Sequence, residues 1–343
     1  MIKGQNVFIS IDWLSLFCSG KVNSSSKYQF VETECSSRVF TKIFKVVRKN
    51  KPFATVQAVP RGVILKPDAL IVKFENSLLY EVDGMYIIQE FIEDLQWTVN
   101  NISRLDICGD FIGFENGLSV QKFIQRLMSH FYLFNNKCEC HVYFTSDYQN
   151  SYNGLTIGKR SSPVHTILYN KTKEMAEVKT KAHIVELWQK VGLVCEKDVY
   201  RIEFRMNSDY TSKVQGLGTE SKKMDYKDLA SYEFVKRIWY SLFLEKFNVK
   251  INDNQQNKTR MQNLELLKVD CCKVEKITIT QSKDSGRMEK ILVNKLESIR
   301  QESYNMEVAE VNALTEVMEY LLDTRNLKDY YYSKHPAAVL LKY

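Results

Sequence analysis

The hydrophobic pattern of the first half of the chain is dominated by strand-like stretches. Residues 6–17 alternate apolar and polar side chains with the period of two that is typical of a half-buried strand. Pro163 indicates a bend within one of the other β-rich stretches. Those stretches are 38–47, 52–59, 70–75, 103–111, 139–146, 154–170 and 198–206. Together they predict a central β-sheet.

Three stretches have helical spacing instead. Apolar residues recur every three to four positions in residues 84–98 and 118–134, and residues 172–191 are amphipathic. Helices interspersed among strands in this order predict an α+β domain, with an antiparallel central sheet and helices flanking it. We expect this α+β domain to span residues 1–210.

From about residue 225 the pattern becomes mainly helical. Helices are predicted at 226–247, 286–301 and 306–323, with a short β-like stretch at 274–280. A helical accessory region over 225–343 is therefore expected after the α+β domain, with DNA binding or formation of a homodimer as its two candidate tasks.

Composition permits a nucleic-acid partner and argues against a membrane protein. The net charge is +7, and basic residues cluster around 42–51 and 159–181. No apolar run approaches the ~18 residues that span a bilayer. The eight cysteines are unevenly spaced, which is typical of reduced thiols in the cytoplasm.

Two strand segments carry charged side chains on one face, where burial without partners or a function is costly. Side chains two apart on a strand share a face. Such a face can line a cleft, or it can be an exposed surface of ion pairs, and the segments alone leave both readings open. The residues on these faces are Arg104, Asp106, Cys108 and Asp110 in SRLDICGDF, and Arg201, Glu203 and Arg205 in YRIEFRM.

A third segment places a phenol and an ammonium group near each other. Tyr169 and Lys171 are two apart in LYNKTKE, so a regular strand puts both on one face. A phenol with a pKa of about 10 is a weak nucleophile at neutral pH, and a nearby cation or base is what its activation requires.

The order of these motifs resembles the replication initiation factors of rolling-circle plasmids and related phages. RLDICGD, then LYNKTKE, then RIEFR follow the order of that family's motifs, and the opening IDWLSLFC resembles its first strand. The resemblance covers residues 6–206. One departure is Ile167, which stands where the family often has an arginine two residues before its tyrosine.

The resemblance implies a role for each matching position. Tyr169 corresponds to the nucleophile that becomes linked to DNA, and Lys171 is its catalytic neighbour. Asp106 and Glu203 correspond to ligands or supports of a Mg²⁺ or Mn²⁺ ion, with Asp110 as a weaker third. Expected DNA-binding residues are Gly158 and Arg160 in the turn before the tyrosine strand, together with Arg104, Arg201 and Arg205.

The implied protein nicks one DNA strand at an origin through a 5′-phosphotyrosine intermediate and so starts rolling-circle replication. Its DNA is single-stranded or a hairpin at the nick site. A host helicase and polymerase are expected partners, because the sequence has no G-x-x-x-x-G-K-[ST] loop. A relaxase that nicks a transfer origin is the nearest alternative, and a DNA-binding regulator without catalysis is an alternative of another class.

Overall fold

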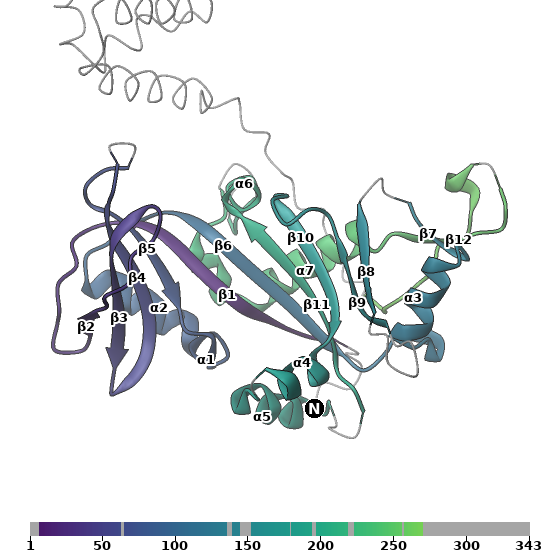
Figure 1. Ribbon diagram of the computed structural model, residues 1–343, viewed down its shortest axis with the longest axis horizontal. Helices are drawn as coiled ribbons and strands as arrows, with labels where there is room; N and C mark the ends of the chain where they lie inside the picture. Colours follow the sequence, from purple (N-terminus) through teal and green to yellow (C-terminus); the bar gives the residue numbers. More distant parts are fainter. Residues whose placement is uncertain are drawn as a thin grey trace, which may run out of the picture. The chain divides into compact units, whose positions relative to one another are not determined.

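One antiparallel sheet organises the part of the chain that the structure describes (Figure 1). The structure is a computed structural model that describes residues 7–62, 65–135, 139–144, 152–178, 180–193, 197–218, 223–255 and 257–269. Ten strands run in the order β2-β3-β4-β5-β1-β6-β11-β10-β9-β8. Their bounds are β1 Phe8–Ser19, β2 Gln29–Glu32, β3 Phe40–Arg48, β4 Lys51–Pro60, β5 Ala69–Phe74, β6 Thr98–Phe111, β8 Cys140–Phe144, β9 Tyr152–Ile157, β10 Val164–Asn170 and β11 Tyr200–Asn207.

Helices pack against the sheet, and the predicted α+β class with its antiparallel sheet and flanking helices is confirmed. The long helices α2, α3 and α7 contribute apolar side chains to the main core, as do the short α1 and α6, while α4 and α5 belong to a separate apolar cluster. The helices are α1 Asn76–Leu79, α2 Gly84–Asp94, α3 Val120–Met128, α4 Lys171–Glu177, α5 Ala182–Val191, α6 Ser208–Thr211 and α7 Tyr232–Lys246. A small pair, β7 Tyr132–Phe134 with β12 Val249–Ile251, and the 3₁₀ turns Glu115–Gly117, Tyr226–Ala230 and Lys258–Arg260 complete the described elements.

Helix α7 belongs to the same compact unit as the sheet, which extends from Met1 to Thr280. Its Trp239 is fully buried and packs against Phe204 of β11 with ring centroids 5.7 Å apart. Gly109 of β6 makes room for the indole, because a Cβ atom there would lie 2.4 Å from Trp239 Cζ2. The domain boundary expected near residue 210 is thus not where the compact unit ends.

Several predicted elements differ from the observed ones in length. The helix predicted over 172–191 is two helices, α4 and α5, and the helix predicted over 118–134 ends at Met128. Its last residues form β7 instead, since they pair with β12 from far along the chain. The elements predicted at 274–280, 286–301 and 306–323 lie outside the described residues. No helix in the described ranges has the length and hydropathy to cross a membrane.

Alternation along the central strands gives the sheet one apolar and one polar face. On β6, Leu105, Ile107 and Phe111 are buried in the main core. The residues between them face the other side, toward α4 and α5 and the α1 segment, where polar contacts replace apolar ones. The candidate site therefore lies on the face that α7 does not cover.

Candidate active site

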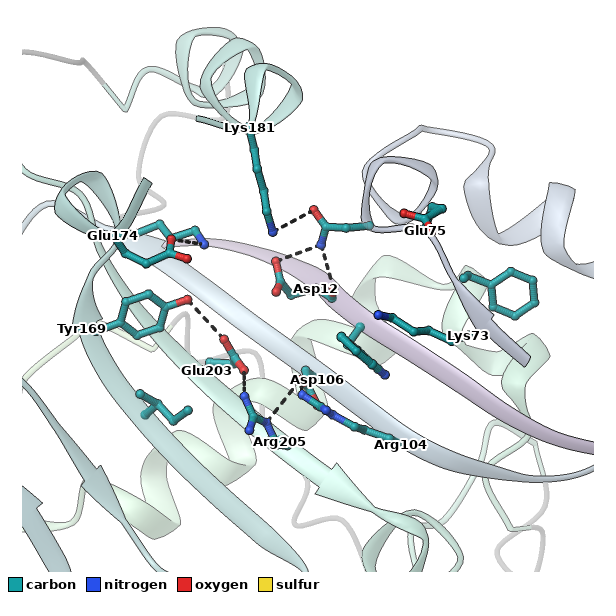
Figure 2. Close-up of a pocket in the computed structure, with 15 residues that line it drawn as sticks. Asp12, Lys73, Glu75, Arg104, Asp106, Tyr169, Glu174, Lys181, Glu203 and Arg205 are labelled. Carbon is teal, nitrogen blue, oxygen red and sulfur yellow. Dashed lines mark hydrogen bonds and ion pairs between the residues drawn. The ribbon is translucent and has the colours of Figure 1, made fainter. Parts of the chain in front are cut away.

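A cavity of about 510 Å³ opens on the polar face of the sheet, above β1, β6, β10 and β11. Helices α1 and α4 and the residue before α5 contribute to its rim, and Figure 2 shows the side chains pointing toward one another from these elements. Its charged and phenolic lining residues are Asp12, Lys73, Glu75, Arg104, Asp106, Tyr169, Lys171, Glu174, Lys181, Glu203 and Arg205. The structure thus brings together six residues that the sequence selected: Arg104, Asp106, Tyr169, Lys171, Glu203 and Arg205.

Asp106 and Glu203 are two buried carboxylates on neighbouring strands. In the register of β6 and β11, Asp106 lies opposite Arg205, two positions from Glu203 on the same face. Arg104 donates from Nε to Asp106 Oδ1 at 2.9 Å, and Arg205 donates from Nη2 to Glu203 Oε1 at 3.1 Å. Burial raises the pKa of Asp106 to about 6. The positive charge of Arg104 opposes this rise, and the negative charge of Glu203 adds to it.

Tyr169 reaches the carboxylate pair from β10. Its Oη donates to Glu203 Oε2 at 3.3 Å, as Figure 2 shows. Burial raises the pKa of the phenol well above its ordinary value, and the negative charge of Glu203 adds to this rise while Arg201 opposes it. The phenol is therefore protonated at neutral pH, with a carboxylate already placed to accept its proton.

Lys171 is held beside the phenol by the local sequence. Asn170 caps α4 by accepting from Lys173 N at 2.9 Å, so the helix starts where β10 ends and Lys171 is its first residue. Lys171 is 2% exposed, its Nζ lies 2.7 Å from Glu174 Oε2, and it is 5.6 Å from the centroid of the Tyr169 ring. A buried cation thus faces the ring of the candidate nucleophile.

Asp110 and Arg201 share the face of the pocket residues but lie beneath the lining, outside the cavity. Both side chains are fully buried. Arg201 donates to Asp110 through Nε and Nη2, at 2.7 and 2.8 Å, and to Asp12 Oδ1 through Nη1 at 2.6 Å. Trp188 of α5 donates to Asp110 Oδ2 at 2.8 Å, and Tyr80 donates to Asp12 Oδ1 at 2.8 Å. These bonds make the pair a support for the pocket floor.

Asp12 lines the pocket although the alternation in residues 6–17 did not select it. The register of β1 against β6 shifts between Ile11 and Trp13, so Asp12 is the extra residue of a β-bulge. Burial acts to raise its pKa, but the charges of Arg201, Lys181 and Lys171 outweigh burial and hold that pKa well below its ordinary value. The sequence signal that could have selected Asp12 was its position as an acidic residue inside an apolar strand.

Lys181 reaches the same rim from the residue before α5. Its Nζ lies 3.5 Å from Asn76 Oδ1, and Nε2 of His183 lies 2.9 Å from the same oxygen. Sequence reasoning missed Lys181 because it belongs to a cluster of basic residues, and such clusters usually lie on a solvent-exposed surface.

Gly158 and Arg160 do not line the pocket. Gly158 has φ +84° in the turn between β9 and β10, where a side chain would be strained, and its carbonyl lies 3.0 Å from Nδ1 of His165. Arg160 is exposed on the same turn. Their predicted contacts with DNA therefore concern the end of the hairpin and not the cavity.

The oxygen donors fit a hard divalent ion. Mg²⁺ is commonly held by one or two carboxylates, with water and substrate phosphate completing its shell, and Asp106 and Glu203 are two buried carboxylates that line the pocket. No group of three or more His, Cys, Asp or Glu side chains within the described ranges is arranged to hold a metal. Binding of an ion by Asp106 and Glu203 stays a prediction.

The fold has similarity to solved structures. The rolling circle replication initiator protein from Geobacillus stearothermophilus is similar with a TM-score of 0.46 and 12% sequence identity, over 75% of this chain and 92% of that chain. No protein-family model matches the sequence, and the comparison with curated proteins finds no match. A similarity at this level carries no argument about activity, which must come from the pocket.

Proposed function

We propose that this protein nicks one strand of DNA with Tyr169 as nucleophile and thereby initiates rolling-circle replication. The observation that carries the proposal is the hydrogen bond from Tyr169 Oη to Glu203 Oε2, in a cavity that also holds Asp106 and two arginines. Such a set is what phosphoryl transfer to a side chain requires: a nucleophile, a base and positive charge around the phosphate.

The proposed reaction exchanges one phosphodiester bond for another. Tyr169 Oη attacks the phosphorus as its proton passes to Glu203 Oε2, an Oη–P bond forms, and the bond from phosphorus to the 3′ oxygen breaks. The departing oxygen takes a proton from solvent and leaves a 3′-hydroxyl that a polymerase can extend. Attack of a 3′-hydroxyl on the phosphotyrosine reverses these steps and rejoins the strand.

Arginine side chains orient the phosphate in this proposal. Arg104 and Arg205 are partly exposed, at 31% and 25%, and their guanidinium groups already lie against Asp106 and Glu203. Guanidinium groups bind phosphate oxygens in a bidentate manner, so the two side chains can turn from carboxylate to phosphate when DNA enters. A Mg²⁺ or Mn²⁺ ion held by Asp106 and Glu203 supplies Lewis-acid polarisation of the phosphate when bound.

The decisive experiment compares the wild type with Tyr169→Phe on single-stranded DNA that contains the origin of the protein's own replicon, with Mg²⁺ or Mn²⁺ present. The wild type should yield a cleaved strand and a DNA-linked peptide that mass spectrometry maps to Tyr169, and Tyr169→Phe should yield neither. Tyr86→Phe is the matched control, since Tyr86 is 61% exposed and does not line the pocket.

Cleavage that persists in Tyr169→Phe would show that another residue is the nucleophile. DNA binding by the wild type without cleavage under any of these conditions would favour the regulator over the nickase. A nick whose product supports strand transfer between cells and not replication would favour the relaxase, which uses the same chemistry.

A further inference from the structure

Trp13 lies on the pocket wall between two cations. Lys73 Nζ is 3.7 Å and Arg104 Cζ is 4.1 Å from the centroid of its ring. The two cations approach from opposite sides of β1, because β5 and β6 are its two neighbours in the sheet. Trp13 Nε1 is buried and has no hydrogen-bond partner among the described residues. The wall thus has an aromatic surface and an unused donor that the nicking chemistry does not explain.

The two cations belong to a row that crosses the sheet away from Tyr169. In the strand register, Arg104 lies opposite Ser15, Ser15 opposite Lys73, Lys73 opposite Thr55, and Thr55 opposite Lys45. Paired residues share a face, so all of these side chains lie on the polar face. We call Lys45, Lys73 and Arg104 the cation row. It extends about 19 Å over four strand spacings.

The cation row has an excess of positive charge close to the pocket. Burial lowers the pKa of Lys73, and the nearby charges of Arg104 and Lys181 lower it further, against an opposing contribution from Glu75. Neither Lys73 nor Lys45 forms an ion pair with a carboxylate in the described part of the chain. Figure 2 shows Lys73 and Arg104 on the side of the pocket opposite Tyr169. Repulsion among cations that an anion would relieve is typical of a phosphate-binding surface.

We propose that Trp13 and the cation row bind the single-stranded DNA that continues from the scissile phosphate toward β3. One unpaired base stacks on the Trp13 indole, Lys73 moves from the ring to a phosphate, and Lys45 holds a phosphate further along. An unpaired strand suits this surface because its bases have a free π face, whereas duplex bases are already stacked on each other. The inference rests on the proposed function, since it takes the Tyr169 pocket as the start of the strand.

The test is equilibrium binding of a fluorescent single-stranded oligonucleotide to the full chain with Tyr169→Phe, which removes the nucleophile. Trp13→Leu should weaken binding roughly fivefold or more, as expected for loss of one base–aromatic stack. Lys73→Met and Lys45→Met should each reduce the slope of log K against log salt by about 0.7, the value for one phosphate contact on a single strand.

Lys42→Met is the matched control. Lys42 is an exposed lysine of the same strand as Lys45 but lies three positions away, on the opposite face, and pairs with Glu32. Its loss should leave the salt slope unchanged. Because Lys45 is exposed, its substitution should not perturb folding, so the proposal stays testable even if Trp13→Leu fails to fold.

The outcomes separate the two proposals. Unchanged affinity in Trp13→Leu together with unchanged salt slopes in Lys73→Met and Lys45→Met overturns the binding surface, even if the wild type cleaves DNA through Tyr169. Equal loss in Lys42→Met also overturns it, because the effect is then one of net charge. Weaker binding confined to Trp13→Leu, Lys73→Met and Lys45→Met supports the binding surface. If that pattern is found and the wild type forms no Tyr169 adduct, the nicking proposal alone is overturned.

Discussion

Replacing Arg201 with methionine should destabilise the fold far more than replacing any other arginine of the pocket face. The change keeps an unbranched side chain but removes the charge that three short hydrogen bonds, of 2.6 to 2.8 Å, direct at Asp110 and Asp12. Asp110 is fully buried, and without Arg201 its one remaining side-chain hydrogen bond among the described residues is that from Trp188. Removing one partner of a buried ion pair typically costs about 3–5 kcal/mol, because the remaining charge is left uncompensated.

The matched control is Arg205→Met, four residues along the same strand and on the same face. Arg205 is 25% exposed. Without it, Glu203 keeps the hydrogen bond from Tyr169 and Asp106 keeps the bidentate contact from Arg104, so the loss should be about 1–2 kcal/mol. Urea unfolding followed by far-UV circular dichroism measures both free energies of unfolding. A loss below about 1 kcal/mol for Arg201→Met, or one equal to that of Arg205→Met, would refute the reasoning.

The pH dependence gives a second check on the same variant. The folded-state pKa of Asp12 lies below its ordinary value of 3.8, in large part because of Arg201. Stability from this carboxylate is therefore fully present above that value and is lost as the pH falls through the folded-state pKa. The difference in free energy of unfolding between wild type and Arg201→Met should be largest near pH 7 and should shrink below about pH 4.

Three further changes test other parts of the structure. Asp106→Asn should abolish metal-dependent nicking. In the wild type, the raised pKa of Asp106, about 6, means that the free energy of unfolding contributed by this group falls as the pH rises from about 4 to 6, because the charged form is the costly one in the folded protein. Asp106→Asn should remove that fall. Lys171→Met should slow nicking of the cognate strand by about 10²-fold, the usual loss for one preorganised charge. When the same substitution is added to the Tyr169→Phe protein, binding of that strand should change less. Equal nicking rates in the wild type and Lys171→Met would exclude a role for Lys171 in the reaction. Gly109→Ala should lower the free energy of unfolding by about 1–3 kcal/mol in a urea titration, because the added methyl group meets the Trp239 ring.

Strand periodicity predicted the polar face correctly wherever a strand is regular. Arg104 and Asp106 on β6, and Glu203 and Arg205 on β11, meet in one pocket because these strands are antiparallel neighbours with the same alternation. Periodicity does not predict that these two strands are neighbours, because they pair through residues about a hundred positions apart in the sequence.

Periodicity gives the face of a residue but not its depth. Asp110 and Arg201 were placed with the pocket residues, yet Trp188 of α5 covers Asp110, and the guanidinium of Arg201 is enclosed by its partners. The break between α4 and α5 was missed for a related reason. Residues 172–191 keep an amphipathic pattern throughout, and the turn at Val178 interrupts the helix without changing it.

The bulge at Asp12 lets β1 carry one residue more than its partner strand without a change of face. Ile9 and Ile11 before the bulge and Leu14 after it all reach the same core, because the extra position is absorbed at Asp12. Deleting Asp12 alone would therefore restore strict alternation and leave these three side chains on the core face. The same deletion would remove a carboxylate from the pocket and a partner from Arg201. In an alignment of this strand, a one-residue deletion at this position would mark a chain that keeps the sheet but has lost this part of the site.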